Sequence, residues 1–418
     1  MLKLQIISCL VAVCAQAATI RAVHAEEPPR PLVEAPDDRG RLHALIEIAK
    51  QNAPEVSLAK ASLTSSRSAL VNGKMAPLGN PYLEVTAERG NRGVTKDVAI
   101  NGTLWLPVEL SGQRGTRRRE AEDFVSLHSA FVEQARARAA ARAVRAYGFS
   151  VVGAERTTVL SELLNSARAE AELIAERVKA GDAIARDASL AAVEAARHEV
   201  MLAETRAEML HAQGELAELL GRDTLESLPP TAPPSLRPSD FRGVKVDQTP
   251  NSQALRAEAR FYSASAERLA REGQSALSLG LVAGRGDYGE TRLGGGLAYA
   301  FPVFRANRPE RARAAAESTR ALSEKRVQES VVSRRLKLLQ LEQEQLVRAL
   351  STLTSTALPA AQHAVSAVQE TYAAGKAEML AVLLSRRELS ALALRRLELL
   401  ERNWLLVSEY VEITGDLP

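Results

Sequence analysis

Apolar and polar residues alternate with a period of two in four short segments of the chain, at 81–88, 97–107, 276–284 and 291–303. Such alternation predicts β-strands with one apolar and one polar face. The apolar face would carry Leu83, Val85, Val98, Ile100, Leu104, Leu277, Leu279, Leu293, Leu297, Tyr299 and Phe301. The opposite face would carry mainly Glu, Asp, Asn, Thr, Ser, Arg and Gly. Each segment has about the length of a tilted strand that crosses a bilayer, roughly 9–11 residues.

Much longer segments lack this alternation and are predicted to be helices. The segment 113–178 contains no proline and is expected to form one helix, which at ~1.5 Å per residue would be about 100 Å long. The last helix carries an apolar seam whose 4-3-4-3-4 spacing is typical of a coiled-coil interface. The seam consists of Ala393, Leu397, Leu400, Trp404, Val407 and Val411. Shorter helices are predicted at 42–75 and 251–273, and Pro359 should kink the second long helix.

Matching residues at two nearly equal offsets indicate that one unit occurs twice. At an offset of 195, Pro107, Val108, Arg118, Ala121 and Glu122 match Pro302, Val303, Arg313, Ala316 and Glu317. At an offset of 194, Glu176, Ala180, Gly181, Ala183, Leu190 and Glu194 match Glu370, Ala374, Gly375, Ala377, Leu384 and Glu388. We expect a first repeat at 26–221, a proline-rich linker at 222–250 and a second repeat at 251–415. Each repeat would contain a helix, two strands and a helical hairpin with its tip near 181 or 375. Chance matching in Ala-, Glu- and Arg-rich helices is the alternative.

The first 25 residues have the layout of a secretory signal peptide. Lys3 precedes an apolar stretch, and Val23-His24-Ala25 places small residues before a cleavage site at Glu26. A retained anchor and lipidation at Cys9 are the alternatives. Both cysteines lie in this segment, so the exported chain would have none and could not be a disulfide scaffold.

Composition and motifs argue against catalysis, cofactors and nucleic-acid binding. The net charge is +3 with mixed signs along the chain, and aromatic residues make up 4%, which suits long helices better than a compact enzyme. There is no Gly-x-Ser-x-Gly and no phosphate-binding loop. Only Glu194 and His198 have helical ligand spacing, and a surface pair is the simpler interpretation than a metal site. We therefore predict no enzyme activity, no cofactor and no bound metal.

The strands and helices together predict an assembly. Four amphipathic strands cannot close a barrel, and an open edge in lipid leaves backbone groups unpaired, whereas three copies would supply twelve strands. The predicted fold is mainly α and internally duplicated. Long antiparallel coiled-coil helices would form a periplasmic tunnel, and four β-strands per chain would contribute to a 12-stranded trimeric outer-membrane barrel. The apolar strand face would meet lipid, and residues 89–96 and 285–291 would form extracellular loops. A soluble β-sandwich face is the alternative for the strands alone.

Several segments resemble a known family. The residues Leu106-Pro107-Val108-Glu109-Leu110-Ser111-Gly112-Gln113-Arg114, Asn80-Pro81-Tyr82-Leu83 and Ile413-Thr414-Gly415 are similar to segments of cobalt–zinc–cadmium and nickel–cobalt efflux outer-membrane components. Together with the duplicated units, they resemble the TolC family of outer-membrane factors over nearly the whole exported chain. The resemblance implies a homotrimeric exit duct that works with a periplasmic adaptor and an inner-membrane transporter of the resistance–nodulation–division class.

The resemblance also implies roles for the hairpin tips. The adaptor would dock at Gly181, Asp182, Gly375, Lys376 and Glu378. In relatives, acids just past the tip glycine narrow the periplasmic aperture, and Asp187 occupies one such position. Its counterparts in the second repeat, Ala381 and Leu384, are apolar, which argues against several acidic rings. The alternative role for Asp187 is to stabilise the N-terminus of the following helix.

The function expected from these observations is passive export of divalent heavy-metal cations, such as cobalt, nickel, zinc and cadmium, through an outer-membrane duct. A TolC-like factor for drug efflux or type I protein secretion is the near alternative. A periplasmic adaptor would have one hairpin rather than two, and a structural stalk or adhesin would not require duplicated strand pairs.

Overall fold

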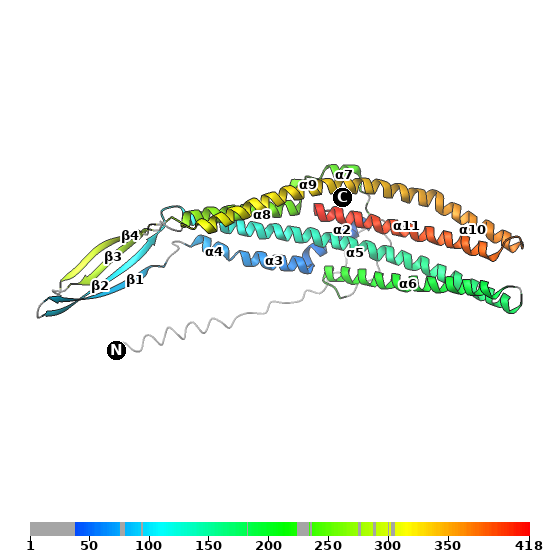
Figure 1. Ribbon diagram of the computed structural model, residues 1–418, viewed down its shortest axis with the longest axis horizontal. Coiled ribbons are helices and arrows are strands. Elements are labelled where there is room, and N and C mark those ends of the chain that lie inside the picture. Colours follow the sequence, from blue (N-terminus) through cyan, green and yellow to red (C-terminus); the bar gives the residue numbers. More distant parts are fainter. Residues whose placement is uncertain are drawn as a thin grey trace.

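The computed structural model describes residues 38–75, 80–92, 95–181, 183–223, 234, 236–274, 277–286, 290–299, 301 and 306–418. The predicted signal peptide lies outside these residues. The described part is elongated, with a β-sheet at one end and long helices that run away from it (Figure 1). No helix among the described residues combines the length and the apolar content needed to span a bilayer.

The sheet has four antiparallel strands in the order of the sequence. These are β1 (Tyr82–Arg92), β2 (Thr95–Val108), β3 (Leu277–Arg285) and β4 (Thr291–Tyr299), and β2 pairs with both β1 and β3. The β1–β2 ladder continues from Tyr82 opposite Trp105 to Arg92 opposite Thr95. The loop expected at 89–96 is therefore mostly strand, because backbone pairing tolerates the polar and glycine residues that suggested a loop. β4 ends at Tyr299, so Phe301 lies beyond the strand in which it was predicted.

Six long helices follow or precede the strands. They are α5 (Gln113–Lys179), α6 (Ala185–Leu220), α8 (Pro250–Glu272), α9 (Arg308–Thr352), α10 (Leu358–Ala373) and α11 (Met379–Thr414). The 67 residues of α5 give it a length of ~100 Å at ~1.5 Å per residue. α6 packs on α5, α5 on α11, and α11 on both α9 and α10. Far from the sheet, α6 and α10 lie at opposite edges of this layer (Figure 1).

The helix predicted at 42–75 is three helices, α2 (Asp38–Asn52), α3 (Pro54–Ser66) and α4 (Ala69–Lys74). Pro54 stands at the first position of α3, where its missing N–H costs nothing and its fixed φ begins a new helix. The described part of the proline-rich linker contains two short helices, α7 (Pro238–Arg242) and the 3₁₀ helix η1 (Val246–Gln248). The single-helix prediction was wrong because it treated Pro54 as an ordinary helical residue.

The predicted irregularity near Pro359 is present. A π-helical turn, η2 (Leu353–Ala357), separates α9 from α10, and Pro359 lies in the first turn of α10. A proline has no N–H to donate to the carbonyl of the residue four positions earlier, and its ring lies too close to that carbonyl in a regular α-helix. The wider π turn accommodates this conflict without ending the helix.

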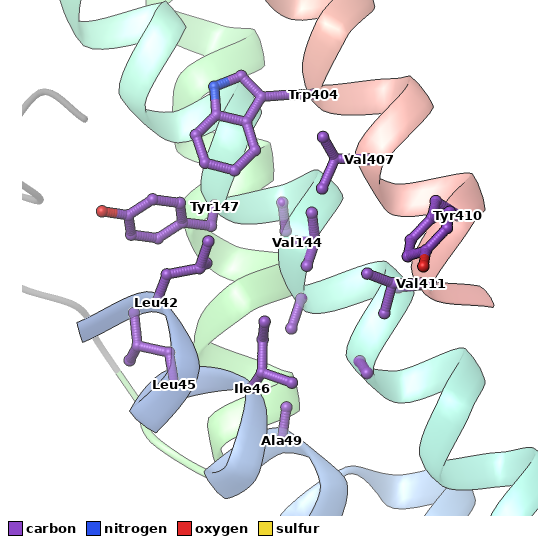
Figure 2. Close-up of a cluster of buried hydrophobic side chains, with 14 of the residues drawn as sticks. Leu42, Leu45, Ile46, Ala49, Val144, Tyr147, Trp404, Val407, Tyr410 and Val411 are labelled. Atoms are coloured by element: carbon purple, nitrogen blue, oxygen red, sulfur yellow. The ribbon is translucent and has the colours of Figure 1, made fainter. Parts of the chain in front are cut away.

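The main hydrophobic core lies midway along the helices, where α2, α5 and α11 meet. Figure 2 shows Leu42, Ile46, Tyr147 and Trp404 pointing toward one another from these three helices. The seam residues Leu397, Trp404, Val407 and Val411 are at most 1% exposed. The predicted coiled-coil seam is therefore the α11 contribution to this core. Gly148 on α5 faces Trp404 so closely that an added Cβ would lie 2.6 Å from the Cβ and Cδ2 atoms of the tryptophan.

Candidate functional site

One face of the sheet carries apolar side chains that lie exposed on the surface of the chain. Cross-strand partners share a face, and the register places Leu83, Leu104, Leu281 and Gly295 in one such row. The large apolar side chains of this face are between 38% and 82% exposed, with Leu293 the most exposed. They include the predicted lipid-facing residues Leu83, Val85, Val98, Ile100, Leu104, Leu279, Leu293, Leu297 and Tyr299, whereas Leu277 is half-buried and Phe301 lies just past β4.

The opposite face is mainly polar or small, although it also carries Val282, and it holds two aromatic rings that were not among the predicted site residues. Trp105 lies on this face because it pairs with Tyr82 on β1 and with Gly280 on β3. Its indole Nε1 donates a hydrogen bond to Glu84 Oε2 at 2.9 Å. The Tyr82 and Trp105 rings are stacked with centroids 6.4 Å apart and an interplanar angle of 28°. Because side chains alternate between the two faces along β2, the sequence already indicated that Trp105 and Leu104 point to opposite faces of the sheet.

A buried ion pair joins the sheet to the long helix. Arg117 in α5 donates to both carboxylate oxygens of Glu109, at 2.7 and 3.1 Å, and to the Met75 carbonyl at 3.0 Å. The Arg117 and Glu109 side chains are 8% and 10% exposed. A bidentate guanidinium–carboxylate pair fixes distance and orientation together. This pair therefore sets the angle at which β2 continues into α5.

The two hairpin tips contain the predicted glycines in conformations that favour glycine. Gly181 has φ +85° and Gly375 has φ +71°, and a residue with a Cβ would be strained at either position. Lys376 is exposed, and Glu378 is the residue that precedes α11. Asp182 lies outside the described residues. The structure thus places Gly181 at one turn and Gly375, Lys376 and Glu378 at the other, while adaptor docking remains a prediction.

Asp187 lies in the first turn of α6 and is half-buried. Its Oδ1 accepts from Arg186 Nη2 at 3.3 Å. A carboxylate in the first turn interacts favourably with the positive end of the helix dipole. This geometry fits the helix-stabilising role, and the role of Asp187 at an aperture stays a prediction.

Polar contacts connect the two hairpins, and sequence reasoning did not find them. Arg156 on α5 pairs with Glu401 on α11 at 2.7 Å. Nearer the tips, Arg386 donates to Glu170 Oε2 at 2.8 Å. Burial raises the pKa of Glu170, and Arg386 opposes that shift.

Closest to the tips, Arg177 of α5 donates to the Tyr372 hydroxyl of α10. These pairs hold one hairpin against the other along their length.

No cluster of three or more His, Cys, Asp or Glu residues suited to a metal ion occurs among the described residues. His198 is 6% exposed, and its Nε2 lies 3.6 Å from Glu194 Oε1. Burial lowers the pKa of His198, and Glu194 opposes this. His198 is buried and Glu194 is half-buried, so this is not the surface pair that was expected.

Comparisons with known proteins agree with this architecture. No protein-family model matches the chain. The cobalt-zinc-cadmium resistance protein CzcC of Cupriavidus metallidurans is 26% identical over 387 residues, which cover 90% of each chain.

Two solved structures have the same fold over most of their length. A membrane protein from Pseudomonas aeruginosa superposes with a TM-score of 0.74 at 17% identity, over 94% of this chain and 99% of that chain. The outer membrane protein VceC from Vibrio cholerae superposes with a TM-score of 0.71 at 16% identity, over 90% of this chain and 97% of that chain. In fold and in sequence, the chain therefore resembles the TolC family of outer-membrane factors, channel proteins with large periplasmic tunnels.

Proposed function

We propose that this chain forms the outer-membrane exit duct of a tripartite efflux pump and passively conducts divalent heavy-metal cations such as cobalt, nickel, zinc and cadmium. The observation that carries the choice of cargo is the similarity to a cobalt-zinc-cadmium resistance protein over 90% of both chains. The two-faced sheet at the end of a long helical layer supports the duct itself, because it separates an apolar surface for lipid from a polar surface for water.

Three copies would close the sheet. A single sheet of four strands leaves the outer edges of β1 and β4 free in the described chain, and unpaired backbone groups in lipid cost several kcal/mol each. Pairing β1 of one copy with β4 of the next would remove both edges. Twelve strands would then surround a lumen lined by the polar face, as in other membrane barrels.

The helices offer matching edges for the same closure. α6 carries an exposed seam with 3-4-3-4-3-4 spacing on the side away from its buried contacts. This seam consists of Val193, Ala196, Val200, Ala203, Ala207, Leu210 and Gly214. α10, at the other edge of the layer, exposes the small residues Ala360, Ala364, Ala367 and Thr371 with 4-3-4 spacing. In coiled-coil packing each seam side chain inserts between four side chains of the facing helix, so α6 of one copy would pack against α10 of the next.

The energy for export would come from partners. The duct would receive its cargo from a periplasmic adaptor docked at the hairpin tips and from an inner-membrane transporter of the resistance–nodulation–division class. Gly181, Asp182, Gly375, Lys376 and Glu378 would form the docking surface. Asp187 would contribute one carboxylate per copy near the aperture, where like charges attract cations.

The proposal is tested by deleting the gene and measuring growth inhibition by Ni²⁺, Co²⁺, Zn²⁺, Cd²⁺ and Cu²⁺ alongside dyes, detergents and antibiotics. We expect sensitivity to metals, restored by the wild-type gene. A variant with Leu210→Asp in the α6 seam should not restore resistance and should lose the trimer band on an unheated gel, whereas Glu204→Gln, outside the seam on the same helix, should behave as wild type. Sensitivity to organic compounds alone would refute the metal cargo and favour drug efflux.

A further inference from the structure

Trp105 is a large aromatic residue on the mainly polar face of the sheet, where neither packing in a core nor contact with lipid explains it. Burying an indole normally stabilises a protein by removing its large apolar surface from water. Here the ring lies on the face opposite the exposed apolar residues, next to Glu84 and Thr103, and it is only half-buried. A tryptophan placed only for packing or for lipid contact would lie on the other face.

Glycines on the strands beside Trp105 leave room for the indole ring against the sheet. A Cβ added at Gly280 would lie 2.8 Å from Trp105 Cζ3, and one added at Gly296 would lie 3.1 Å from Cη2. Any larger residue at Gly280 would push the indole out of position. The two glycines therefore let the six-membered ring of the indole lie close to the backbone of β3 and β4.

The surroundings of the ring are open and carry negative charge. On β3 and β4 most residues of this face near Trp105 are small, namely Ser278, Gly280, Gly294, Gly296 and Ala298, and Val282 is the one larger side chain. Glu84 is held against the indole edge by the 2.9 Å hydrogen bond, and Tyr82 extends the aromatic surface. Arg292, a basic residue of this face, pairs with Glu290 at 2.6 Å near the other end of β4. The site thus presents π faces and a carboxylate without a nearby counter-cation among the described residues.

We propose that Trp105, Tyr82 and Glu84 form a binding site on the lumen wall for aromatic organic cations. Aromatic faces attract cations through their quadrupole, most strongly for Trp, and planar rings also stack on them. A hydrated divalent metal ion keeps its water shell and gains little from such a surface. An aromatic cation is weakly hydrated, so it gains stacking from the rings and attraction from Glu84 at once. The site rests on the proposed duct, because the polar face becomes a lumen wall only when the barrel closes, and it adds a ligand class beyond metals.

Three copies would place three such sites at the same height. Trp105 pairs near the beginning of β1 and close to the end of β2 that leads into α5, so the sites would lie at the helix-proximal end of the barrel. A cation entering from the helical tunnel would meet them before Glu88, which lies four residues after Glu84 on β1 and about 14 Å from it at ~3.4 Å per residue.

The test uses ethidium, a planar aromatic cation, and the purified full-length chain in planar lipid bilayers. Wild type should show ethidium block of the single-channel current. Trp105→Leu, which keeps an apolar side chain without a π face, should raise the blocking concentration by about fivefold or more. Glu84→Gln should raise it similarly. Glu88→Gln is the matched control, since it removes the same charge from the same strand and face, and it should leave the block near the wild-type value.

A second measurement, of tryptophan fluorescence, detects binding independently of channel conductance. In a Trp404→Phe variant, Trp105 is the remaining tryptophan of the chain, and ethidium should quench its fluorescence with a saturable dependence on concentration. The site would be overturned if ethidium blocked all variants at the same concentration. It would also be overturned if Glu88→Gln raised the blocking concentration as much as Glu84→Gln while Trp105→Leu left it unchanged. Absence of any conductance together with saturable quenching would refute the duct and support the site. Absence of conductance with linear, non-saturating quenching would refute both.

Discussion

The close approach of Gly148 to Trp404 allows a quantitative prediction. Replacing Gly148 by alanine adds a Cβ that would stand 2.6 Å from two atoms of Trp404, whereas carbon atoms pack at about 3.5–4.0 Å. Trp404 is fully buried and packs edge-to-face on Tyr147 with centroids 5.6 Å apart. The ring cannot turn aside, so α5 and α11 would have to separate by about 1 Å.

Overpacking of this kind typically costs about 1–3 kcal/mol. Alanine also favours the helix over glycine by up to about 1 kcal/mol, which would mask part of the loss. Gly115→Ala separates the two effects, because Gly115 lies in the same helix and an added Cβ there meets nothing within 4 Å. We expect Gly115→Ala to be neutral or slightly stabilising. Gly148→Ala should be less stable than Gly115→Ala by about 1–3 kcal/mol.

The assay is urea unfolding of the detergent-purified chain, followed by far-ultraviolet circular dichroism. Trp404 emission in a Trp105→Phe background reports in parallel whether the buried ring has moved. Equal stability of Gly148→Ala and Gly115→Ala, with unchanged Trp404 emission, would refute the reasoning that this contact is rigid.

Three further predictions follow from features described above. Arg117→Met leaves the Glu109 carboxylate buried without its guanidinium and should destabilise the chain by about 3 kcal/mol or more in the same urea assay; an unchanged midpoint would contradict this. Burial lowers the pKa of His198 from 6.5, so as the pH falls the unfolded chain binds a proton that the folded chain resists. Stability should therefore fall from neutral pH downward, and His198→Gln should lessen that fall while His211→Gln, at an exposed position on the same helix, should not. Leu293→Arg should cost about 2–4 kcal/mol in lipid and reduce the trimer recovered from the outer-membrane fraction; full recovery would show that this face does not meet lipid.

Local patterns in the sequence were sufficient for the strands and the long helices. Alternation found all four strands to within a few residues of their bounds, because each strand has one exposed apolar face. The 4-3 spacing found the α11 seam for a similar reason, since Trp404 and its neighbours pack on one side. Pro54 misled the helix prediction because one residue decides whether a helix continues or restarts.

The contacts of the candidate site depend on residues far apart in the chain. Arg156 and Glu401 are separated by 245 positions, and no local pattern relates them. Trp105 could be assigned to the polar face from alternation, but its fit against Gly280 requires the β2–β3 register. The buried state of His198 likewise depends on how α6 packs on α5, which a single helix pattern does not specify.

The position of the hydrophobic core gives the molecule a gradient of local stability along its axis. The main cluster joins α2, α5 and α11, and a smaller cluster of Leu160, Leu164 and Leu202 follows toward the tips. Beyond it, polar contacts such as Arg386–Glu170 hold the hairpins together. Segments with few buried apolar contacts open at a small fraction of the global unfolding free energy. Amide hydrogen exchange should therefore be slowest around Trp404 and fastest at the turns. A partner that rearranges the tips would have to break a few polar contacts while the core stays closed.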